Sequence, residues 1–451
     1  MHPVLVLAAA IAVVFLLIIR LKINAFIALI TAAIVVGVLS PQVPFGEIMP
    51  KVAGLFGTLC GKIGIVIALA ALIGQCLMES GAADKIVRVF VRILGEKRSS
   101  LSLVSSGYVL SIPVFFDTVF YLLVPLARAM RIRTGRHYLL FLMSICCGAT
   151  VTHSLVPPTP GPLAMAAELK IDLGVMILVG AVIAVPASIV GWLFSVWRDR
   201  TFEVPFRETP GMSVEELEEL AARDESLLPG FWHSLAPILL PVLLITSNTV
   251  INAIDESSPL AVYTGFLGDP NFALLVSAAV ALHLLATSRR MSLAEMAKPV
   301  ELALANGGLI ILITAAGGSF GGMLVEAGVG KALGEMAGSY NIPLLLLAFL
   351  LAVLIKIAQG SGTVAMITVS SIMAPIVLMA GPSYHTVYVA CAIGSGSLVG
   401  SWMNDSGFWV YKQMSGLTEV EALKTWTPLL AVNGVAGFLA TVLFAWLLPL
   451  R

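Results

Sequence analysis

A series of long apolar runs constrains this chain more than any other feature. A helix needs about 20 apolar residues, with a range of roughly 17–25, to cross about 30 Å of hydrocarbon. Eight runs are about that long, at residues 3–19, 23–40, 54–79, 173–197, 231–251, 271–287, 302–325 and 428–449. With 59% apolar and 12% charged residues, the chain is also more apolar than soluble domains are. The sequence predicts an all-α membrane protein in a lipid bilayer.

The composition excludes several classes of function. The 26 Lys and Arg residues balance the 26 Asp and Glu residues, so no basic field is available to bind nucleic acid. The five cysteines lie in apolar runs without metal-ligand spacing. The sequence lacks an HExxH motif, a P-loop lysine motif, and a GxGxxG motif between a strand and a helix. We therefore expect no metal, no cofactor and no enzyme activity of these kinds.

Four polar or proline-containing interruptions break the remaining apolar stretches. Residues 100–130 are interrupted at 112–117 and residues 341–380 at 358–363, and both read as the tips of re-entrant hairpins. Two further stretches read as broken transmembrane helices: residues 137–169 are interrupted at 152–161, and residues 384–416 at 401–407. Irregular backbone is tolerated at membrane depth only where it lines a cavity, so the breaks predict a transporter with a central site.

The two halves of the chain repeat this order. Glu79-Ser80-Gly81 aligns with Glu326-Ala327-Gly328 and Pro157-Pro158 with Asn404-Asp405, at one constant offset. Basic residues flank the first hairpin on both sides, so both of its ends are predicted to be cytoplasmic; they are Lys85, Arg88, Arg92, Lys97, Arg98, Arg128, Arg131, Arg133 and Arg136. The flanks of the second hairpin hold only Lys331 as far as His385, so it is predicted to enter from outside. The repeats are therefore predicted to be inverted, with ten crossings and both termini periplasmic.

These features divide the chain into five parts. They are N-terminal transmembrane helices (1–53), a first repeat (54–197), a cytoplasmic linker (198–230), connecting transmembrane helices (231–301) and a second repeat (302–451). Arg20 and Lys22 follow the first run, which fits an uncleaved helix rather than a signal peptide. Within the linker, Ser213 and Glu216 form a capping box that predicts an acidic helix from Val214 to about Leu228.

The breaks supply the candidate binding residues. Each break precedes a half-helix whose N-terminus carries free N–H groups and about half a positive charge, so the ends together favour an anion. The substrate-binding candidates are Phe116, Thr152, His153, Pro158, Thr159, Gln359, Gly360, Ser361, Gly362, Thr363, Asn404 and Ser406. The alternative is that the glycines only pack helices together, as small residues do in membranes.

Ionisable side chains at membrane depth are functional candidates because their insertion costs about 2.5–3.5 kcal/mol each. Asp117 is the first choice for the proton-coupling group, because burial favours its neutral form and a nearby cation its charged form. Asp405 and His153 are further candidates for proton coupling. The alternatives are that both aspartates cap helices and that His153 is a structural donor. Lys356 is expected to pair with Asp405, Asp117 or a substrate carboxylate, unless it extends to the membrane surface.

At these breaks the chain resembles the gluconate permease (GntP) family of proton-coupled sugar-acid transporters, whose layout is similar to a wider superfamily of anion carriers. The resemblance covers nearly the whole length and is carried by IPVFFD at 112–117, Thr152-His153 with Pro157-Pro158, AQGSGTVA at 358–365 and NDSGFW at 404–409. It implies symport of gluconate or a related hydroxy acid with protons into a bacterium. It also implies a homodimer in which hairpins and broken helices move as a unit against a scaffold.

The resemblance leaves the substrate open. Thr159 stands where the family pattern has a second histidine, and Gly362 where alanine is usual. Glycerate, other hexonates and D-serine are alternatives to gluconate, and sodium is an alternative to the proton. Two remote hypotheses are a passive anion channel and an intramembrane serine protease. The protease would use Ser361 as nucleophile with His153 or His385 as base.

Overall fold

The computed structural model describes residues 2–21, 23–95, 98–207, 228–255, 258–329, 332, 343–403 and 405–450, without the side chains of residues 15, 18, 19, 133, 293, 358 and 359. The predicted acidic helix between Val214 and Leu228 therefore lies almost wholly outside the described residues, as do Lys331 and Asn404. The described residues form helices and contain no strand, which confirms the all-α prediction.

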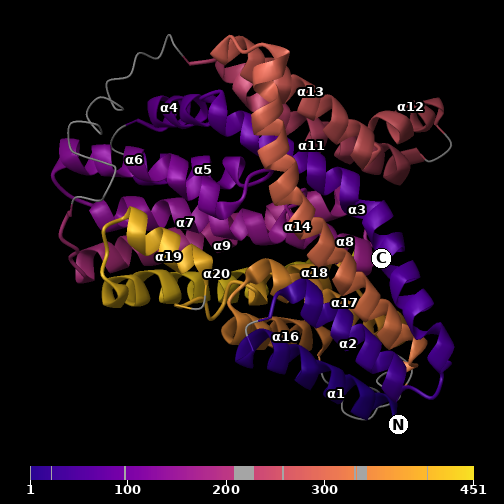
Figure 1. Ribbon diagram of the computed structural model, residues 1–451. Coiled ribbons are helices and arrows are strands. Elements are labelled where there is room, and N and C mark those ends of the chain that lie inside the picture. The colour runs from indigo at the N-terminus through magenta and orange to yellow at the C-terminus, as the bar shows by residue number, and fades with distance from the viewer. Residues whose placement is uncertain are drawn as a thin grey trace.

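The helices follow the order of the apolar runs and their breaks (Figure 1). In the first half they are α1 (Pro3–Phe15), which continues as a π-helical turn to Arg20, α2 (Ala25–Leu39), α3 (Ile48–Glu79), α4 (Ala82–Leu94), α5 (Ser99–Leu110), α6 (Phe116–Thr134), α7 (Tyr138–Leu155), α8 (Pro160–Glu168) and α9 (Leu173–Thr201). In the second half they are α11 (Phe231–Asp255), α12 (Pro259–Leu267), α13 (Pro270–Arg289), α14 (Leu293–Glu326), α16 (Leu344–Gln359), α17 (Gly362–Ala380), α18 (Val387–Gly396), α19 (Ser406–Met414) and α20 (Glu419–Leu447).

Eight helical segments of the described residues are long and apolar enough to cross a membrane. They are Phe45–Glu79, Tyr138–Glu168, Leu173–Thr201, Phe231–Asp255, Pro270–Arg289, Ala294–Glu326, Gly362–Ala380 and Glu419–Leu447. The chain is therefore a multi-pass membrane protein. The predicted crossing at 3–19 is helical throughout, because α1 has 13 residues and continues as the π-helical turn to Arg20. The predicted crossing at 23–40 is shorter than expected: α2 has 15 residues, because Asn24 begins the helix as its N-cap and accepts the N–H of Phe26.

Two predicted crossings are longer than their apolar runs because capping boxes start the helices earlier. Ser292 and Glu295 begin α14 nine residues before the run at 302, and Thr418 and Glu421 begin α20 well before the run at 428. In each box the hydroxyl accepts the N–H of the glutamate, whose carboxylate accepts the N–H of the cap residue.

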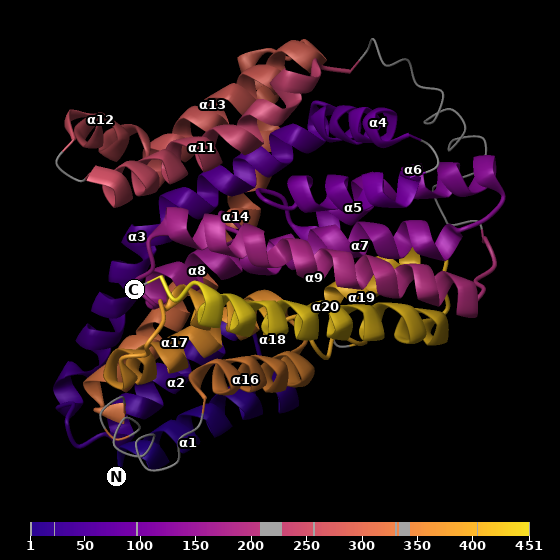
Figure 2. The same cartoon turned by 180° about the vertical axis from the view of Figure 1, so that it is seen from behind.

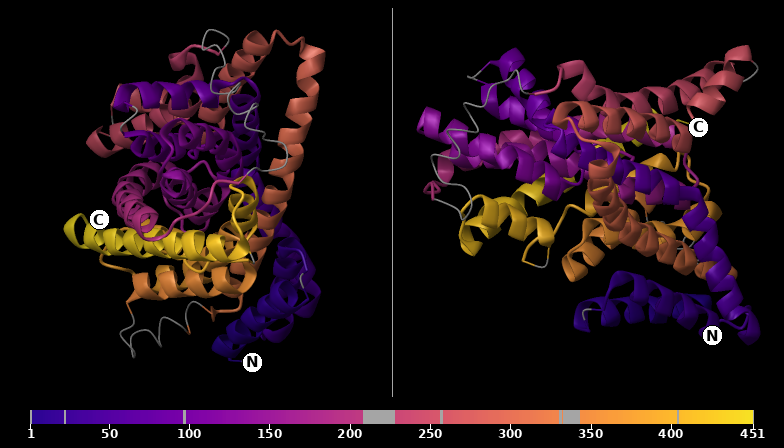
Figure 3. Two further views of the ribbon diagram at one scale, coloured as in Figure 1. Left: turned by 90° about the vertical axis from the view of Figure 1, so that its left-hand side faces the viewer. Right: turned by 45° about the horizontal axis from the view of Figure 1, so that its top comes forward.

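The helix contacts are duplicated between the halves. In the first half α5 packs on α7 and α7 packs on α9; in the second half α16 packs on α18 and α18 packs on α20. Helices α9 and α20 pack on each other and join the two series (Figure 2). The long helices α3 and α14 are also in contact, and Figure 3 shows α14 running along one side of the molecule. This pairing supports the proposed repeat.

Close helix approach holds the first hairpin against the first broken helix. At Gly148 of α7, an added Cβ would lie 2.1 Å from the carbonyl oxygen of Val104 and 2.7 Å from the nitrogen of Tyr108, both in α5. Only glycine permits two backbones to approach this closely. The α5–α7 contact therefore fixes the position of the hairpin relative to the break that follows α7.

Candidate functional site

A small polar cavity lies where the breaks meet. Its volume is about 160 Å³, and its lining comes from the starts of α6, α17 and α19, from Lys356 in α16, and from the sides of α7 and α20. Nine of the residues predicted from the sequence line it: Phe116, Asp117, His153, Lys356, Ser361, Gly362, Thr363, Asp405 and Ser406. Elements far apart in the chain thus contribute to one site.

A buried ion pair lies in the cavity wall. The Nζ atom of Lys356 is 2.6 Å from Oδ2 of Asp405, and the two residues are only 3% and 9% exposed. Lys356 also donates to the carbonyl oxygen of Gly360 at 2.5 Å, within the hairpin tip. The pair therefore ties the tip between α16 and α17 to the second broken helix.

Asp405 is held by further donors. As the N-cap of α19, its Oδ1 accepts the N–H of Gly407 at 3.0 Å, while Oδ2 also accepts the hydroxyl of Ser401. Ser401 in turn accepts the indole N–H of Trp426 at 2.6 Å. Asp405 thus caps α19, which is one of the two roles considered for it from the sequence. It also pairs with Lys356, for which it was one of the partners considered.

Three helix N-termini face the cavity. The N-caps of α6, α17 and α19 are Phe115, Ser361 and Asp405, and residues of each first turn line the wall. The side chain of Phe115 cannot accept a hydrogen bond, so the first N–H groups of α6 have no side-chain cap. Lys356 and Asp405 offset each other, so the three partial positive charges of the helix starts make the cavity suited to an anion.

Asp117 lies in the first turn of α6 and lines the same cavity. It follows the N-cap by two residues, and the structure gives α6 no side-chain capping bond. Because Lys356 and Asp405 cancel each other, the protonation state of Asp117 decides the net charge that these three side chains give the cavity. Asp117 is thus an ionisable side chain of the cavity wall in addition to the Lys356–Asp405 pair.

Thr152 and His153 lie in the last turn of α7, beside the cavity. The His153 ring lies 5.8 Å from the Phe115 ring, and its Nδ1 atom is buried without a hydrogen-bond partner among the described residues. The Thr152 hydroxyl is likewise buried and without a described partner, although Thr152 does not line the cavity. Unpaired buried polar atoms are costly and therefore uncommon, and here two of them lie together in the last turn of α7.

Several predicted site residues lie outside the cavity lining. Pro158 and Thr159 line a separate, very small space near Pro113, and the Thr159 hydroxyl donates to the carbonyls of His153 and Val156 at 2.9 and 2.7 Å. The Thr159 side chain therefore stabilises the backbone of the loop between α7 and α8. Gly360 adopts φ 92°, a left-handed conformation that favours glycine, and offers its carbonyl to Lys356. The side chain of Gln359 and all of Asn404 lie outside the described residues.

Other lining residues were not among the predicted binding residues. They are Phe115, Thr150, Ser154, Ser397, Leu398, Gly407, Trp426 and Leu430. Thr150 and Ser154 share a helix face with His153, so helical spacing was a usable signal for them. Trp426 and Leu430 come from α20, and only the tertiary fold brings them here.

Aromatic rings form one wall of the cavity. The rings of Phe116 and Trp426 are 5.1 Å apart. At Gly407, an added Cβ would lie 3.1 Å from Trp426 and 3.5 Å from Phe116, so a larger residue would press on both rings. Glycine at this position keeps the start of α19 against the aromatic wall.

Comparison with known proteins decides the family, because the model of the GntP family permeases matches residues 2–447. The chain belongs to the GntP permease family. The resemblance drawn from the four breaks is confirmed, and the chain is a permease rather than an enzyme, which removes the protease hypothesis.

Named relatives agree with this assignment, and a solved structure shares the fold. A gluconate permease of Pseudomonas aeruginosa is 35% identical over 436 residues, covering 96% of this chain and 95% of that protein. The Gnt-II system L-idonate transporter of Escherichia coli is 30% identical over 445 residues, covering 97% and 98%. The fold is similar to that of the YdaH transporter of Alcanivorax borkumensis, with a TM-score of 0.65 at 14% identity, covering 94% of this chain and 98% of that one.

Proposed function

We propose that this permease is a secondary active symporter. It imports a small hydroxy-carboxylate, gluconate or a related sugar acid, together with protons across the bacterial inner membrane. The relatives named for gluconate and L-idonate support the substrate class. The observation that carries the proposal is the placement of Lys356 beside three helix N-termini in one polar cavity.

The cavity is suited to both parts of such a substrate. The carboxylate would take the place of Asp405 as a partner of Lys356, or would share the ammonium with it, and would accept N–H groups at the helix starts. Ser361, Thr363 and Ser406 line the same space and present hydroxyl groups to the hydroxyls of a sugar acid. The Phe116 and Trp426 rings offer an apolar surface to its carbon chain.

Proton coupling would arise at Asp117. With Asp117 ionised, a bound carboxylate meets a second negative charge, and two like charges about 5 Å apart repel by about 3 kcal/mol at an effective dielectric constant of about 20. Protonation of Asp117 removes this repulsion, which is worth about a hundredfold in affinity. The substrate and the proton would therefore bind together and leave together.

Alternating access would follow from the repeated architecture. We propose that the two hairpins, α5–α6 and α16–α17, enter from opposite sides of the membrane, with both termini periplasmic. Together with the broken helices α7–α8 and α18–α19 they would move as a unit against the other helices. The working form would be a homodimer.

Purified protein in proteoliposomes tests the proposal. We expect an inward proton gradient to drive accumulation of labelled gluconate or L-idonate, and an uncoupler to abolish it. Glycerate and D-serine, added as competitors, define the substrate range. Accumulation that survives the uncoupler but requires sodium would refute proton coupling, and flux that never exceeds equilibrium would indicate a channel.

The variant Asp117→Asn separates coupling from binding. It should lose accumulation while it retains exchange of labelled for unlabelled substrate, because a permanently neutral side chain cannot carry the proton. The matched control is Glu203→Gln, which neutralises an exposed carboxylate after α9. If Asp117→Asn accumulates substrate at the wild-type level, another group carries the proton.

A further inference from the structure

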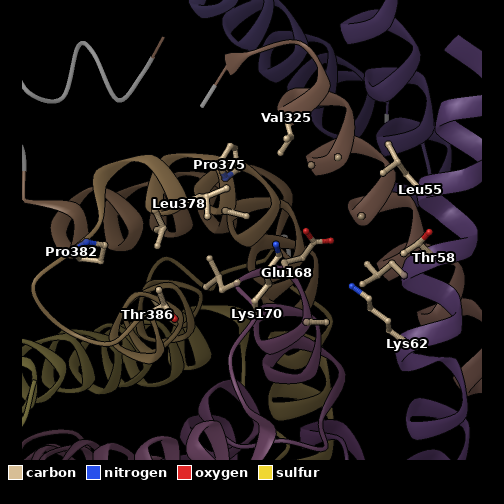
Figure 4. Close-up of a pocket in the computed structure, with 18 of the residues that line it drawn as sticks. Leu55, Thr58, Lys62, Glu168, Lys170, Val325, Pro375, Leu378, Pro382 and Thr386 are labelled. Atoms are coloured by element: carbon tan, nitrogen blue, oxygen red, sulfur yellow. The ribbon is translucent and has the colours of Figure 1, made fainter. Parts of the chain in front are cut away.

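A second, larger cavity lies between α3, α8, α14 and α17. Its volume is about 490 Å³, and it shares no lining residue with the polar cavity. Much of its wall is hydrocarbon, from Leu55 and Leu59 of α3, Val325 of α14, and Val377 and Leu378 of α17. We call it the α3–α8 cavity (Figure 4).

Three charged residues line the α3–α8 cavity. Lys62 comes from α3, Glu168 is the last residue of α8, and Lys170 follows it. Figure 4 shows the Lys62 side chain directed from α3 toward Glu168. The Oε1 atom of Glu168 is buried and has no hydrogen-bond partner among the described residues.

The cavity separates these opposite charges. The ion pairs found in the described part of the chain do not include Lys62, Glu168 or Lys170. Lys62 and Lys170 are exposed, so the cost of a buried polar atom without a partner falls on Glu168. A ligand that carries both a cation and an anion would satisfy both kinds of side chain.

The helix α14 leaves room for this arrangement. At Gly318, an added Cβ would lie 3.1 Å from Oε1 of Glu168 and 2.5 Å from Leu59. A residue with a side chain would therefore compete with the carboxylate for space. Glycine at this position lets α3 approach α14 while Glu168 extends into the cavity.

The wall favours an amphiphile over a sugar acid. A polyhydroxy acid needs hydrogen-bond partners along its whole chain, and besides the charged groups the side chains offer only the hydroxyls of Thr58 and Thr386. The apolar residues Leu378 and Val325 are 68% and 50% exposed, so the cavity opens onto apolar surface that meets lipid chains in a membrane.

We propose that the α3–α8 cavity binds a phospholipid with a primary ammonium headgroup, such as phosphatidylethanolamine. The ammonium donates to Glu168, the phosphate accepts from Lys62 and Lys170, and the acyl chains lie along Leu55, Val325 and Leu378. Opposite charges at the site match opposite charges in the headgroup, and the apolar wall matches its tails.

Native mass spectrometry of delipidated protein in detergent tests this site. Dioleoyl phosphatidylethanolamine, phosphatidylcholine and phosphatidylglycerol are titrated separately, so that only the headgroup differs. The wild type should bind the ethanolamine lipid about tenfold more tightly than the other two, because a hydrogen bond to a charged group is worth 1.5–3 kcal/mol. Only that headgroup has an ammonium that donates hydrogen bonds.

Variants of the lining residues test which side chain contacts which part of the lipid. Glu168→Gln should remove the preference for ethanolamine over choline, whereas Lys62→Met with Lys170→Met should weaken all three lipids about tenfold. Lys298→Met and Glu301→Gln, which change exposed residues of α14, serve as matched controls. Leu378→Trp, which fills the cavity, should weaken all three lipids and keeps the test valid if a charge variant folds poorly.

Three outcomes would overturn the proposal. Equal affinity of the wild type for the three lipids would show that the charged side chains of the cavity do not distinguish the headgroups. Binding of soluble phosphoethanolamine as tight as that of the lipid would assign the site to a free zwitterion. Displacement of the lipid by millimolar gluconate would instead make the cavity part of the substrate path.

Discussion

The ion pair between Lys356 and Asp405 gives the sharpest test of the site. In Lys356→Met, Asp405 keeps the bonds from the Gly407 N–H and the Ser401 hydroxyl but loses its cation. Removal of one member of a buried pair costs about 3–5 kcal/mol. Because the two remaining donors compensate in part, we expect the lower end of that range, a loss of about 3 kcal/mol in the free energy of unfolding.

The reverse change should cost a similar amount. Asp405→Asn retains an oxygen for the Gly407 N–H but leaves the buried ammonium with the Gly360 carbonyl as its partner at this tip. The double variant buries neither charge, so we expect it to lose no more than about 3 kcal/mol, rather than the sum of about 6 kcal/mol.

The assay is reversible unfolding in mixed micelles of increasing denaturing detergent, followed by far-ultraviolet circular dichroism. The four proteins form a double-mutant cycle, and the interaction energy is the departure from additivity. A double variant at about 6 kcal/mol, or a Lys356→Met protein within about 0.5 kcal/mol of the wild type, would refute the buried pair.

Three further changes test other parts of the structure. Gly148→Ala should lower the free energy of unfolding by about 3 kcal/mol, because its Cβ would meet the α5 backbone at 2.1 Å. The control Gly57→Ala, whose Cβ would have nothing within 4 Å, should be neutral or slightly stabilising in the same unfolding assay. Gly407→Ala should raise the KM for uptake several-fold with little change in thermal stability, because its Cβ would press on the Trp426 and Phe116 rings. An unchanged KM would show that these rings do not contact the substrate. Arg128→Met should cost about 2–3 kcal/mol in detergent unfolding, because the buried guanidinium donates to the Tyr138 hydroxyl and the Arg207 carbonyl; a smaller loss would mean that these bonds add little.

The helix breaks were predictable because their signals are local. Pro160 starts α8 directly after a loop, Gly360 supplies the left-handed turn between α16 and α17, and Asp405 caps α19. Each of these residues acts on the backbone next to it, so a single sequence contains the information. The capping boxes that lengthen α14 and α20 are local in the same way, but a criterion based on apolar runs overlooks them.

The partners within the site were not predictable to the same degree. The sequence left Lys356 with a choice between two aspartates, a substrate and the membrane surface, and only tertiary packing selects Asp405. Trp426 lines the cavity from α20, a regular helix whose sequence around this residue contains no break or motif that would indicate a binding site. Thr159 read as a substrate contact from its position in a break, but its hydroxyl serves the loop backbone.

A structure of the protein with bound gluconate, or with whichever sugar acid competes best, tests the central claim most directly. The proposed function predicts ligand density beside Nζ of Lys356, enclosed by the starts of α6, α17 and α19, with hydroxyl groups toward Ser361 and Ser406. Density outside this cavity, with Lys356 and Asp405 still paired and no ligand near them, would contradict it.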